Sequence, residues 1–285
     1  MAKPAAERVS DLLRVPPGPI DLHALPTRAT PGFGGSGKAD ALARRAQLAE
    51  RLATLQEQLY AEGYLGGTRS LLLVLQGMDT SGKGGTVRHV MGQLDPGGVH
   101  AVAFGAPTSE ELRHDFLWRI RQQLPRPGKL GVFDRSHYED VVAVRVRGLA
   151  ARRTWMRRYG SINRFEEKLV ERGTCVVKCF LHISPAEQRK RLLARLDDPT
   201  KQWKFTPDDV ADRERWDDYF VAYEDAIARC NSEFAPWHVV PADRKWYRNW
   251  AITRLLCEQL EELGLRWPEP AFDVAEELQR LRNIP

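Results

Sequence analysis

The sequence predicts an α/β fold in which a central parallel sheet is covered by helices on both faces. Five short apolar runs alternate with helical patterns along the chain, and this alternation is typical of parallel sheets. A glycine-rich segment follows the first run, and an acidic residue ends the third. The predicted strands are Leu71 to Gln76, Val99 to Phe104, Leu130 to Phe133, Thr174 to Leu181 and Trp237 to Val240.

The composition is that of an ordinary globular protein. A length of 285 residues allows one large domain or two small ones, and a hydrophobic content of 42% is enough for a substantial core. The net charge of +5 suits anionic substrates but is too small for a dedicated nucleic-acid binder. No segment resembles a signal peptide or a membrane span. We therefore expect a cytoplasmic protein with neither a nucleic-acid nor a membrane partner.

The chain divides into an arm, one domain and a tail. Residues 1–38 are rich in Pro, Gly and Ala, which predicts an irregular N-terminal arm before the folded core. Residues 39–264 form the predicted domain, and residues 265–285 form a tail that ends in a polar helix and gives no chemical signal. An amphipathic helix leads into the first strand, as its leucines at positions 48, 52, 55 and 59 indicate.

Two further groups of residues are expected in the core. The helix between the third and fourth strands has aromatic and aliphatic residues on one face, which we interpret as packing residues rather than a base-stacking platform. The four cysteines form no C-x-x-C pair, which predicts core thiols. The helix residues are Trp155, Tyr159, Ile162, Phe165 and Leu169, and the cysteines are Cys175, Cys179, Cys230 and Cys257.

The glycine-rich segment from Gly77 to Thr86 predicts a phosphate site. Such a loop turns several backbone N–H groups toward one point, and the following helix adds its positive N-terminal end. Lys83 supplies a point charge. The Walker A pattern G-x-x-x-x-G-K-[ST] fails at its last position, where Gly84 replaces the hydroxyl residue that usually contacts magnesium. Asp79, inside the loop, is then the natural magnesium ligand.

Other residues of this loop are expected to bind phosphate or nucleotide. The alternative is a chance glycine-rich turn, which the preceding strand and the helix-like stretch Val87 to Leu94 disfavour. The expected binding positions are Thr80, Ser81, Gly82, Gly84 and Gly85.

The third strand runs into the acidic motif from Asp134 to Asp140. Asp134 is the Walker B candidate, because a carboxylate at such a strand end orders the magnesium shell of P-loop enzymes. Arg135 is placed to bridge phosphate oxygens. Glu139 belongs either to the site or to a capping box with Ser136 that opens a helix toward Arg147. For His137 a structural hydrogen bond is favoured over a general base.

A strongly cationic segment follows the fourth strand. Ser184 to Glu187 has the cap, proline and acid of a helix start, and it leads into a helix rich in Arg and Lys up to Leu196. A second helix begins at Thr206 to Asp209. The alternative to a binding role is a charged helix face that is simply exposed to solvent. The position after the fourth strand instead favours a lid, about residues 185–210, that closes over phosphates and excludes water.

With these motifs in place, the sequence resembles the family-2 polyphosphate kinases, P-loop phosphotransferases that use inorganic polyphosphate and a nucleotide. The likeness spans nearly the whole core, and its acidic motif is most similar to the branch that acts on both nucleoside mono- and diphosphates. The shared motifs are Gly77-Met78-Asp79 with Gly82-Lys83, Phe104 to Thr108, Leu117-Trp118-Arg119, Asp134 to Asp140, Phe180 to Ser184 with Glu187-Gln188, Trp203-Lys204, Ala235-Pro236-Trp237 and Pro241-Ala242-Asp243.

The resemblance implies a P-loop kinase-like three-layer sandwich with a helical lid. It implies that Mg²⁺, with Mn²⁺ as a substitute, is held by Asp79 and Asp134, and that Lys83 and Arg135 contact phosphates. Arg195 would reach in from the lid. The implied substrates are polyphosphate and AMP, ADP or ATP, with guanine nucleotides as further candidates, and the implied assembly is a dimer or tetramer. Lys38 and Arg119 are implied as additional phosphate contacts.

The expected reaction is a direct, reversible in-line phosphoryl transfer from polyphosphate to AMP or ADP. The chain offers cations, a metal site and a lid but no obvious nucleophile, and phosphoryl transfer needs positioning and charge neutralisation more than a covalent catalyst. Two alternatives stay open. One is an ATP-dependent nucleoside or nucleoside-monophosphate kinase, and the other is a regulatory P-loop protein that binds nucleotide or RNA.

Overall fold

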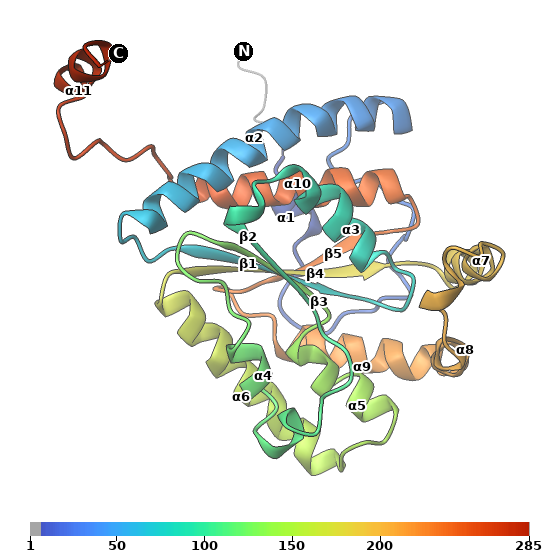
Figure 1. The fold of residues 1–285 in the computed structure, drawn as a ribbon. Helices are drawn as coiled ribbons and strands as arrows, with labels where there is room; N and C mark the ends of the chain where they lie inside the picture. The colour runs from blue at the N-terminus through green and yellow to red at the C-terminus, as the bar shows by residue number, and fades with distance from the viewer. Residues whose placement is uncertain (1–6, 285) are drawn as a thin grey trace.

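The structure, a computed structural model, describes residues 7–284. Five parallel strands form one sheet in the order β2-β3-β1-β4-β5 (Figure 1). All five predicted strands are confirmed, and each end lies within one residue of its predicted position. The strands are β1 (Ser70–Gln76), β2 (Val99–Ala103), β3 (Leu130–Asp134), β4 (Thr174–His182) and β5 (Trp237–Pro241).

Helices cover both faces of the sheet, which makes three layers (Figure 1). One face carries α2 (Lys38–Tyr64), α3 (Lys83–Val90) and α10 (Lys245–Glu262). The opposite face carries α4 (Trp118–Arg121), α5 (Ala143–Val146), α6 (Arg152–Glu171) and α9 (Trp216–Arg229). The expected three-layer α/β sandwich is thereby confirmed.

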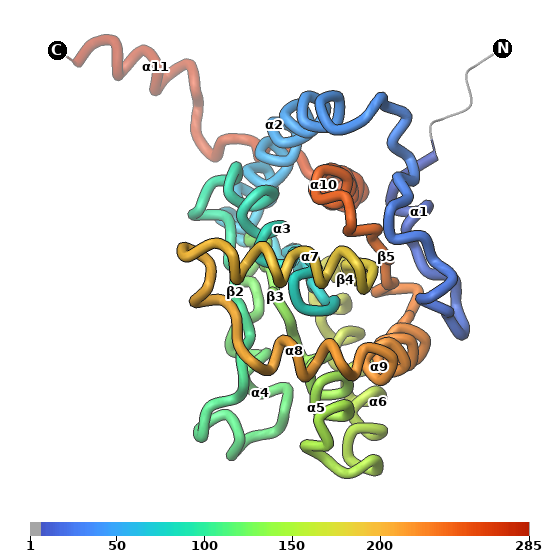
Figure 2. The backbone as a smooth tube through the Cα atoms, turned by 90° about the vertical axis from the view of Figure 1, so that its right-hand side faces the viewer, coloured from blue at the N-terminus to red at the C-terminus, as the bar shows by residue number. Residues whose placement is uncertain are grey.

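The carboxyl ends of the central strands lie side by side. Leu75 of β1 pairs with Asp134 of β3 and with Cys179 of β4, so the segments after these strands leave from one edge of the sheet. Two further helices, α7 (Pro185–Leu196) and α8 (Pro207–Glu214), lie across this edge (Figure 2). The segment expected to form a lid therefore lies at the edge where the phosphate loop begins.

The core is built around β1, in which every residue is buried. The five residues predicted to pack on one face of α6 are all buried. The four cysteines are free thiols; three are buried, and Cys175 is half-buried.

The N-terminal segment differs from its prediction. It contains a short helix, α1 (Val9–Leu13), and the amide of Val15 donates to the carbonyl of Trp237 in β5 at 2.8 Å. Leu22 and Phe33 are buried as well. The expectation that the packed core begins only after this arm is wrong. Its apolar residues are too irregularly spaced to show a helical or strand period, and they become core residues only through contacts with distant elements.

Several short elements complete the chain. The helix-like stretch Val87 to Leu94 is the end of α3 followed by a 3-10 turn, and the helix expected toward Arg147 is a 3-10 turn followed by α5. The C-terminal helix α11 (Val274–Arg282) extends from the body and has no buried residue (Figure 1). The 3-10 turns are η1 (Met91–Gln93), η2 (Pro96–Gly98), η3 (Glu111–Arg113), η4 (His137–Asp140) and η5 (Gln202–Lys204).

Within residues 7–284, no helix is both long enough and apolar enough to cross a bilayer.

Candidate active site

The glycine-rich loop connects the end of β1 to the start of α3. Gly77 and Gly82 have φ angles of 144° and 110°, which side-chain-bearing residues rarely adopt. A Cβ atom on Gly77 would lie 2.7 Å from the carbonyl oxygen of Leu181, so close approach to β4 also requires glycine here. Thr80 has a positive φ angle of 61° without being a glycine. The loop is therefore a strained turn of fixed shape, as expected for a ligand-binding loop.

Lys83, the first residue of α3, folds its side chain back onto this loop. Its Nζ donates to the carbonyl oxygens of Gly77 at 2.7 Å and Met78 at 3.4 Å. Burial lowers the pKa of Lys83, and Arg135 lowers it further, whereas Asp79, Asp134 and Glu139 raise it. Because its hydrogen bonds within the described chain go to carbonyl oxygens only, the ammonium can exchange them for phosphate oxygens.

Asp79 and Arg135 form an ion pair across the loop. The guanidinium donates to Oδ1 of Asp79 at 2.7 Å. Burial raises the pKa of Asp79, but Lys83 and Arg135 outweigh it and hold that pKa below its ordinary value. The pKa of Arg135 is raised, because the nearby carboxylates outweigh its burial. The carboxylate is thus ionised at neutral pH, as a metal ligand must be.

Asp134 ends β3 beside the first turn of α3. A Cβ atom on Gly84 would lie 3.4 Å from Oδ2 of Asp134, in ordinary contact distance. Because Gly84 stands where the Walker A pattern has a hydroxyl residue, no side chain at position 84 covers this side of the Asp134 carboxylate. Asp79 and Asp134 offer the hard oxygen donors that Mg²⁺ prefers. The described residues contain no group of three His, Cys, Asp or Glu side chains suited to a metal, so phosphate oxygens and water would have to complete the coordination.

Glu139 points into the site rather than closing a capping box. The side-chain amide nitrogen of Gln76 donates to Oε1 of Glu139 at 2.9 Å. This is the side-chain orientation in which both the nitrogen and the oxygen of that amide have hydrogen-bond partners. Ser136 caps the turn by accepting from the amide of Tyr138 at 3.2 Å. Burial raises the pKa of Glu139, although Arg135 and Lys83 oppose that shift. Glu139 thus joins the charged groups around the phosphate loop.

Two buried arginines, absent from the predicted site, support the loop from behind. Arg191 of α7 donates to the carbonyl oxygens of Thr80 at 2.9 Å and Ser81 at 3.0 Å. Arg248 of α10 donates to the same Ser81 carbonyl at 3.2 Å. A Cβ atom on Gly82 would lie only 1.6 Å from Nη1 of Arg248, so this arginine also requires the glycine. Burial lowers the pKa of Arg248, and the neighbouring Arg191 lowers it further.

Two loop hydroxyls are buried without a partner. The Oγ1 of Thr80 and the Oγ of Ser81 make no hydrogen bond within the described chain. Buried polar groups are normally satisfied, so such a pair indicates a position that a ligand or water completes. Both residues belong to the predicted phosphate-binding set.

Three predicted residues make no hydrogen bond or ion pair with this cluster within residues 7–284. Arg195, in the last turn of α7, donates to the carbonyl oxygen of Lys204 at 3.0 Å and to Asp209 at 3.4 Å, so it is held within the lid. Arg119 is buried and donates to the carbonyl oxygen of Gly105 at 2.9 Å. Lys38 is exposed at the start of α2, with no hydrogen bond or ion pair found within residues 7–284. The structure thus groups Asp79, Lys83, Asp134, Arg135 and Glu139.

His137 makes a buried hydrogen bond of the structural kind that the sequence favoured. Its side chain is buried, and its Nε2 lies 3.2 Å from Oε1 of Glu166 in α6.

The fold and the site together define a P-loop phosphotransferase. A glycine-rich loop follows the central strand, an acid ends the adjacent strand, and a cationic helical segment follows β4.

Comparison with known proteins places the chain within this class. Residues 36–265 match the sequence model of polyphosphate kinase 2 (PPK2), and the chain belongs to this family. It is 48% identical to the AMP/ADP-polyphosphate phosphotransferase of Meiothermus ruber, over 90% of this chain and 94% of the relative. It is 39% identical to the ADP-polyphosphate phosphotransferase of Rhodopseudomonas palustris, over 93% of each chain.

A solved structure agrees with this assignment. The crystal structure of polyphosphate kinase 2 from Arthrobacter aurescens superposes with a TM-score of 0.94 at 51% identity, and 98% of each chain is covered. The predicted family and fold are confirmed. The protein is a polyphosphate-dependent nucleotide phosphotransferase, which transfers a phosphoryl group between inorganic polyphosphate and a nucleotide.

Proposed function

We propose that this enzyme accepts both AMP and ADP, with polyphosphate as donor. This range of acceptors is supported by the similarity of the chain to the Meiothermus ruber protein, whose name includes both AMP and ADP. Guanine nucleotides are further candidates, because no base-specific contact follows from the residues described. The transfer exchanges one phosphoanhydride for another, so the same site serves both directions.

The observation that carries the proposed chemistry is a set of charged groups without a covalent catalyst. Lys83 and Arg135 would hold the phosphoryl oxygens, and the loop backbone from Thr80 to Gly85 would supply N–H donors at the positive end of α3. The attacking nucleotide phosphate is already ionised near neutral pH. Direct in-line attack therefore needs no strong general base.

A divalent cation, Mg²⁺ or Mn²⁺, would be held by Asp79 and Asp134. When bound, it would neutralise phosphate charge and align the two reacting phosphates. Arg135 now pairs with Asp79, so it would move to a phosphate oxygen as that carboxylate takes the metal. Glu139 lies close enough to Arg135 and Lys83 to orient both.

Closure of the lid would complete the site. Arg195 is held by Lys204 and Asp209 within the lid, and it lies near enough to Asp79 to lower the pKa of that carboxyl. We propose that closure transfers its guanidinium from these partners to the phosphates and excludes water. Lys38 and Arg119 are proposed as supplementary phosphate contacts, and a dimer or tetramer as the assembly, which light scattering of the purified protein would test.

The deciding experiment incubates the protein with magnesium and polyphosphate, adding AMP or ADP in separate tubes. Anion-exchange chromatography resolves the nucleotide products. We expect ADP to form from AMP and ATP to form from ADP, each only when polyphosphate is present. Product in one tube alone would narrow the acceptor range, and transfer from ATP but not from polyphosphate would identify a nucleotide kinase.

A further inference from the structure

One helical face of α6 carries a row of cations without ion-pair partners. The side chains are exposed, and their spacings of four, seven, four and four residues place them along one side of the helix, on which Glu167 and Glu171 are also exposed. None of the five takes part in an ion pair found in the described chain, although 25 such pairs occur elsewhere. We call this row the α6 stripe; it consists of Arg153, Arg157, Arg164 and Lys168 of α6 and of Arg172, which directly follows the helix.

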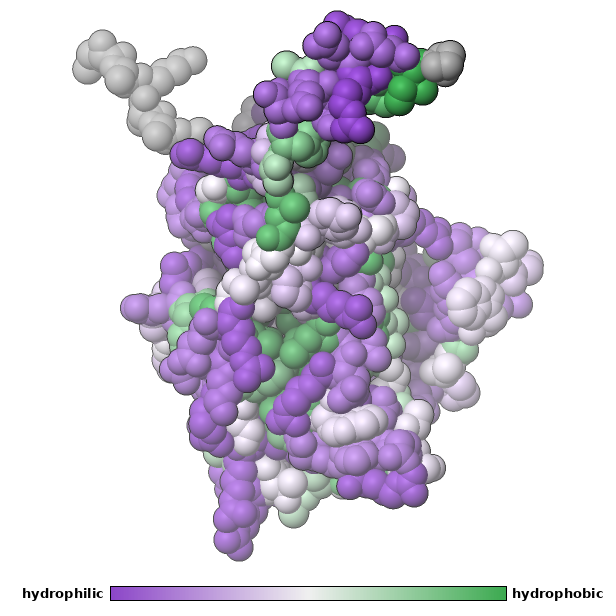
Figure 3. Space-filling view, turned by 60° about the vertical axis from the view of Figure 1, so that its left-hand side comes forward, coloured by the Kyte–Doolittle hydropathy of each residue, from purple (hydrophilic) through white to green (hydrophobic). Residues whose placement is uncertain are grey.

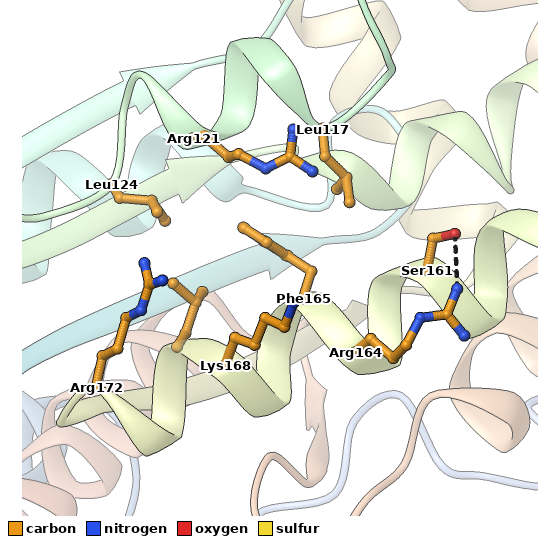
Figure 4. A pocket seen from close by; sticks show the side chains of 9 residues that line it. Leu117, Arg121, Leu124, Ser161, Arg164, Phe165, Lys168 and Arg172 are labelled. Atoms are coloured by element: carbon orange, nitrogen blue, oxygen red, sulfur yellow. Dashed lines mark hydrogen bonds between the residues drawn. The ribbon is translucent and has the colours of Figure 1, made fainter.

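The second half of the stripe borders a groove of about 530 Å³ between α6 and the segment around α4. Figure 4 shows cationic side chains from both elements around an apolar floor. The face turned forward in Figure 3 likewise has apolar surface surrounded by hydrophilic side chains. The floor is Leu117, Leu124, Phe165 and Leu169; the rim is Arg121, Arg164, Lys168 and Arg172, with Ser161, and no acidic residue lines the groove.

The N-terminal half of α6 contacts the segment that carries Glu139. Arg158, next to Arg157 in the sequence, donates to the backbone oxygen of Asp140 at 2.9 Å, and Asp140 directly follows Glu139. From there α6 runs to the opposite edge of the sheet, where it leads into β4 (Figure 1). Its 20 residues correspond to a length of roughly 30 Å. A long anion that starts in the active site could therefore follow the stripe to the groove.

We propose that the α6 stripe and its groove bind the distant part of the polyphosphate chain, while its end phosphates occupy the active site. This proposal rests on polyphosphate being the donor. An extended chain with a charge on every unit fits a row of unpaired cations. A second binding segment raises the effective concentration of the chain at the first one, and so lowers the KM for long chains.

The surface fits a nucleic acid less well. Single-stranded nucleic acids bind through exposed aromatic side chains in addition to cations. Among the aromatic residues of α6, Trp155 and Tyr159 are buried, and Phe165, in the floor of the groove, is only 8% exposed, so none offers a free ring for stacking. A polyanion without bases is the ligand that this face suits.

The test compares long-chain polyphosphate with tetrapolyphosphate as donor for the wild-type protein and the Lys168→Glu/Arg172→Glu variant. Both side chains are exposed, so the fold should tolerate the change. We expect the KM for the long chain to rise about tenfold, with kcat and the KM for tetrapolyphosphate nearly unchanged. Binding of labelled long-chain polyphosphate, measured separately, should weaken by a similar factor. The matched control is Arg280→Glu/Arg282→Glu on α11, which has the same charge change and no buried residue.

Three results would overturn the proposal. One is an unchanged long-chain KM together with unchanged binding. A second is a change of oligomeric state in light scattering, because a second copy of the chain would then cover this face. A third is loss of single-stranded RNA binding without any change in long-chain kinetics. If the wild-type protein used neither donor, the proposed function would fail, while the binding measurement would still decide on the stripe.

Discussion

Two buried lysines, one in strand β4 and one at the start of helix α3, have opposite surroundings. Lys178 of β4 donates to Glu166 at 2.6 Å, to the Tyr138 hydroxyl at 3.0 Å and to the Cys230 carbonyl at 2.6 Å. All three of its donors are used, and its charge is balanced by a carboxylate. Lys83 reaches two loop carbonyls and no carboxylate. The contacts of Lys178 are those of a structural ion pair, whereas the contacts of Lys83 leave its charge available to an anionic ligand.

The nearby glutamates show the same contrast. Burial raises the pKa of Glu166, but Lys178 and His137 outweigh it, so its pKa lies below the ordinary value. The pKa of Glu139 lies above its ordinary value, because burial raises it by more than the charges of Arg135 and Lys83 lower it. A single residue, Ser136, separates the two environments along the chain, since His137 and Tyr138 contact Glu166 while Arg135 contacts Asp79 of the loop. A directly paired opposite charge, rather than burial, thus distinguishes Lys178 from Lys83.

The largest expected effect comes from breaking the satisfied pair. Lys178→Met leaves Glu166 buried without its cation, which should lower the free energy of unfolding by about 3–5 kcal/mol. Turnover per folded molecule should stay near that of the wild type. Urea denaturation and activity at saturating substrate measure the two quantities. The double variant Lys178→Met/Glu166→Gln removes both charges and should cost less than the two single changes together. Full stability of Lys178→Met would contradict the comparison.

The opposite result is expected on the loop side. Asp79→Asn and Asp134→Asn should each lower turnover roughly 10²-fold or more, because each removes a preorganised charge from the reacting phosphates. Their urea midpoints should change little. Steady-state kinetics across a magnesium titration measures the effect, with Asp218→Asn as the control for an exposed, ion-paired aspartate. Near-normal turnover in either variant would remove that residue from the site.

Most of the site could be predicted from the sequence, because local sequence patterns specify it. The strand ends before Gly77 and Asp134 follow from apolar runs, and the topology of parallel strands brings those ends together. Lys83 and Asp79 follow from the spacing of the loop. The cationic lid was recognisable, but Arg195 could not be distinguished from Arg191, which the structure places directly on the loop.

The remainder depends on contacts between distant parts of the chain. Arg248 lies 167 positions from Ser81, and no local motif marks it. The close contact between Gly82 and Arg248 forms only in the folded protein, so a single sequence does not reveal it. The same holds for Lys178, which reads as an interruption of an apolar strand until Glu166 and Tyr138 are placed beside it. The one usable signal was that a lysine inside a buried strand requires a partner.

His137 tests where the boundary between the two environments lies. His137→Gln removes the contact to Glu166 but keeps Lys178 and Tyr138 as its partners. We expect a loss of about 1–2 kcal/mol in unfolding free energy and less than a tenfold loss of turnover. Thermal or urea unfolding and steady-state kinetics decide the matter. A collapse of turnover with the fold intact would place His137 in the chemistry and overturn its structural role.

The smallest effect concerns Glu258, a satisfied carboxylate far from the loop. It accepts from the amides of Val9 at 3.2 Å and Ser10 at 2.8 Å and from Arg254 at 2.7 Å, and so ties the N-terminal segment to α10. Burial raises the pKa of Glu258, but the hydrogen bonds from Ser10, Arg254 and Val9 lower it below the ordinary value of 4.5. A carboxyl whose pKa is lower in the folded state stabilises the protein above its unfolded pKa, and this contribution disappears as the pH falls through the folded value.

The wild-type protein and Glu258→Gln should therefore differ by about 1–2 kcal/mol in unfolding free energy at pH 6. The difference should shrink as the pH falls below 4.5, because a protonated Glu258 then resembles the glutamine. Urea unfolding at a series of pH values measures it, and the comparison of two variants at each pH cancels the titration of all other carboxylates. A difference that stays constant with pH would mean that shape rather than charge makes the contact. Glu258 would then no longer belong with Glu166 among the buried carboxylates that are stabilised by charge.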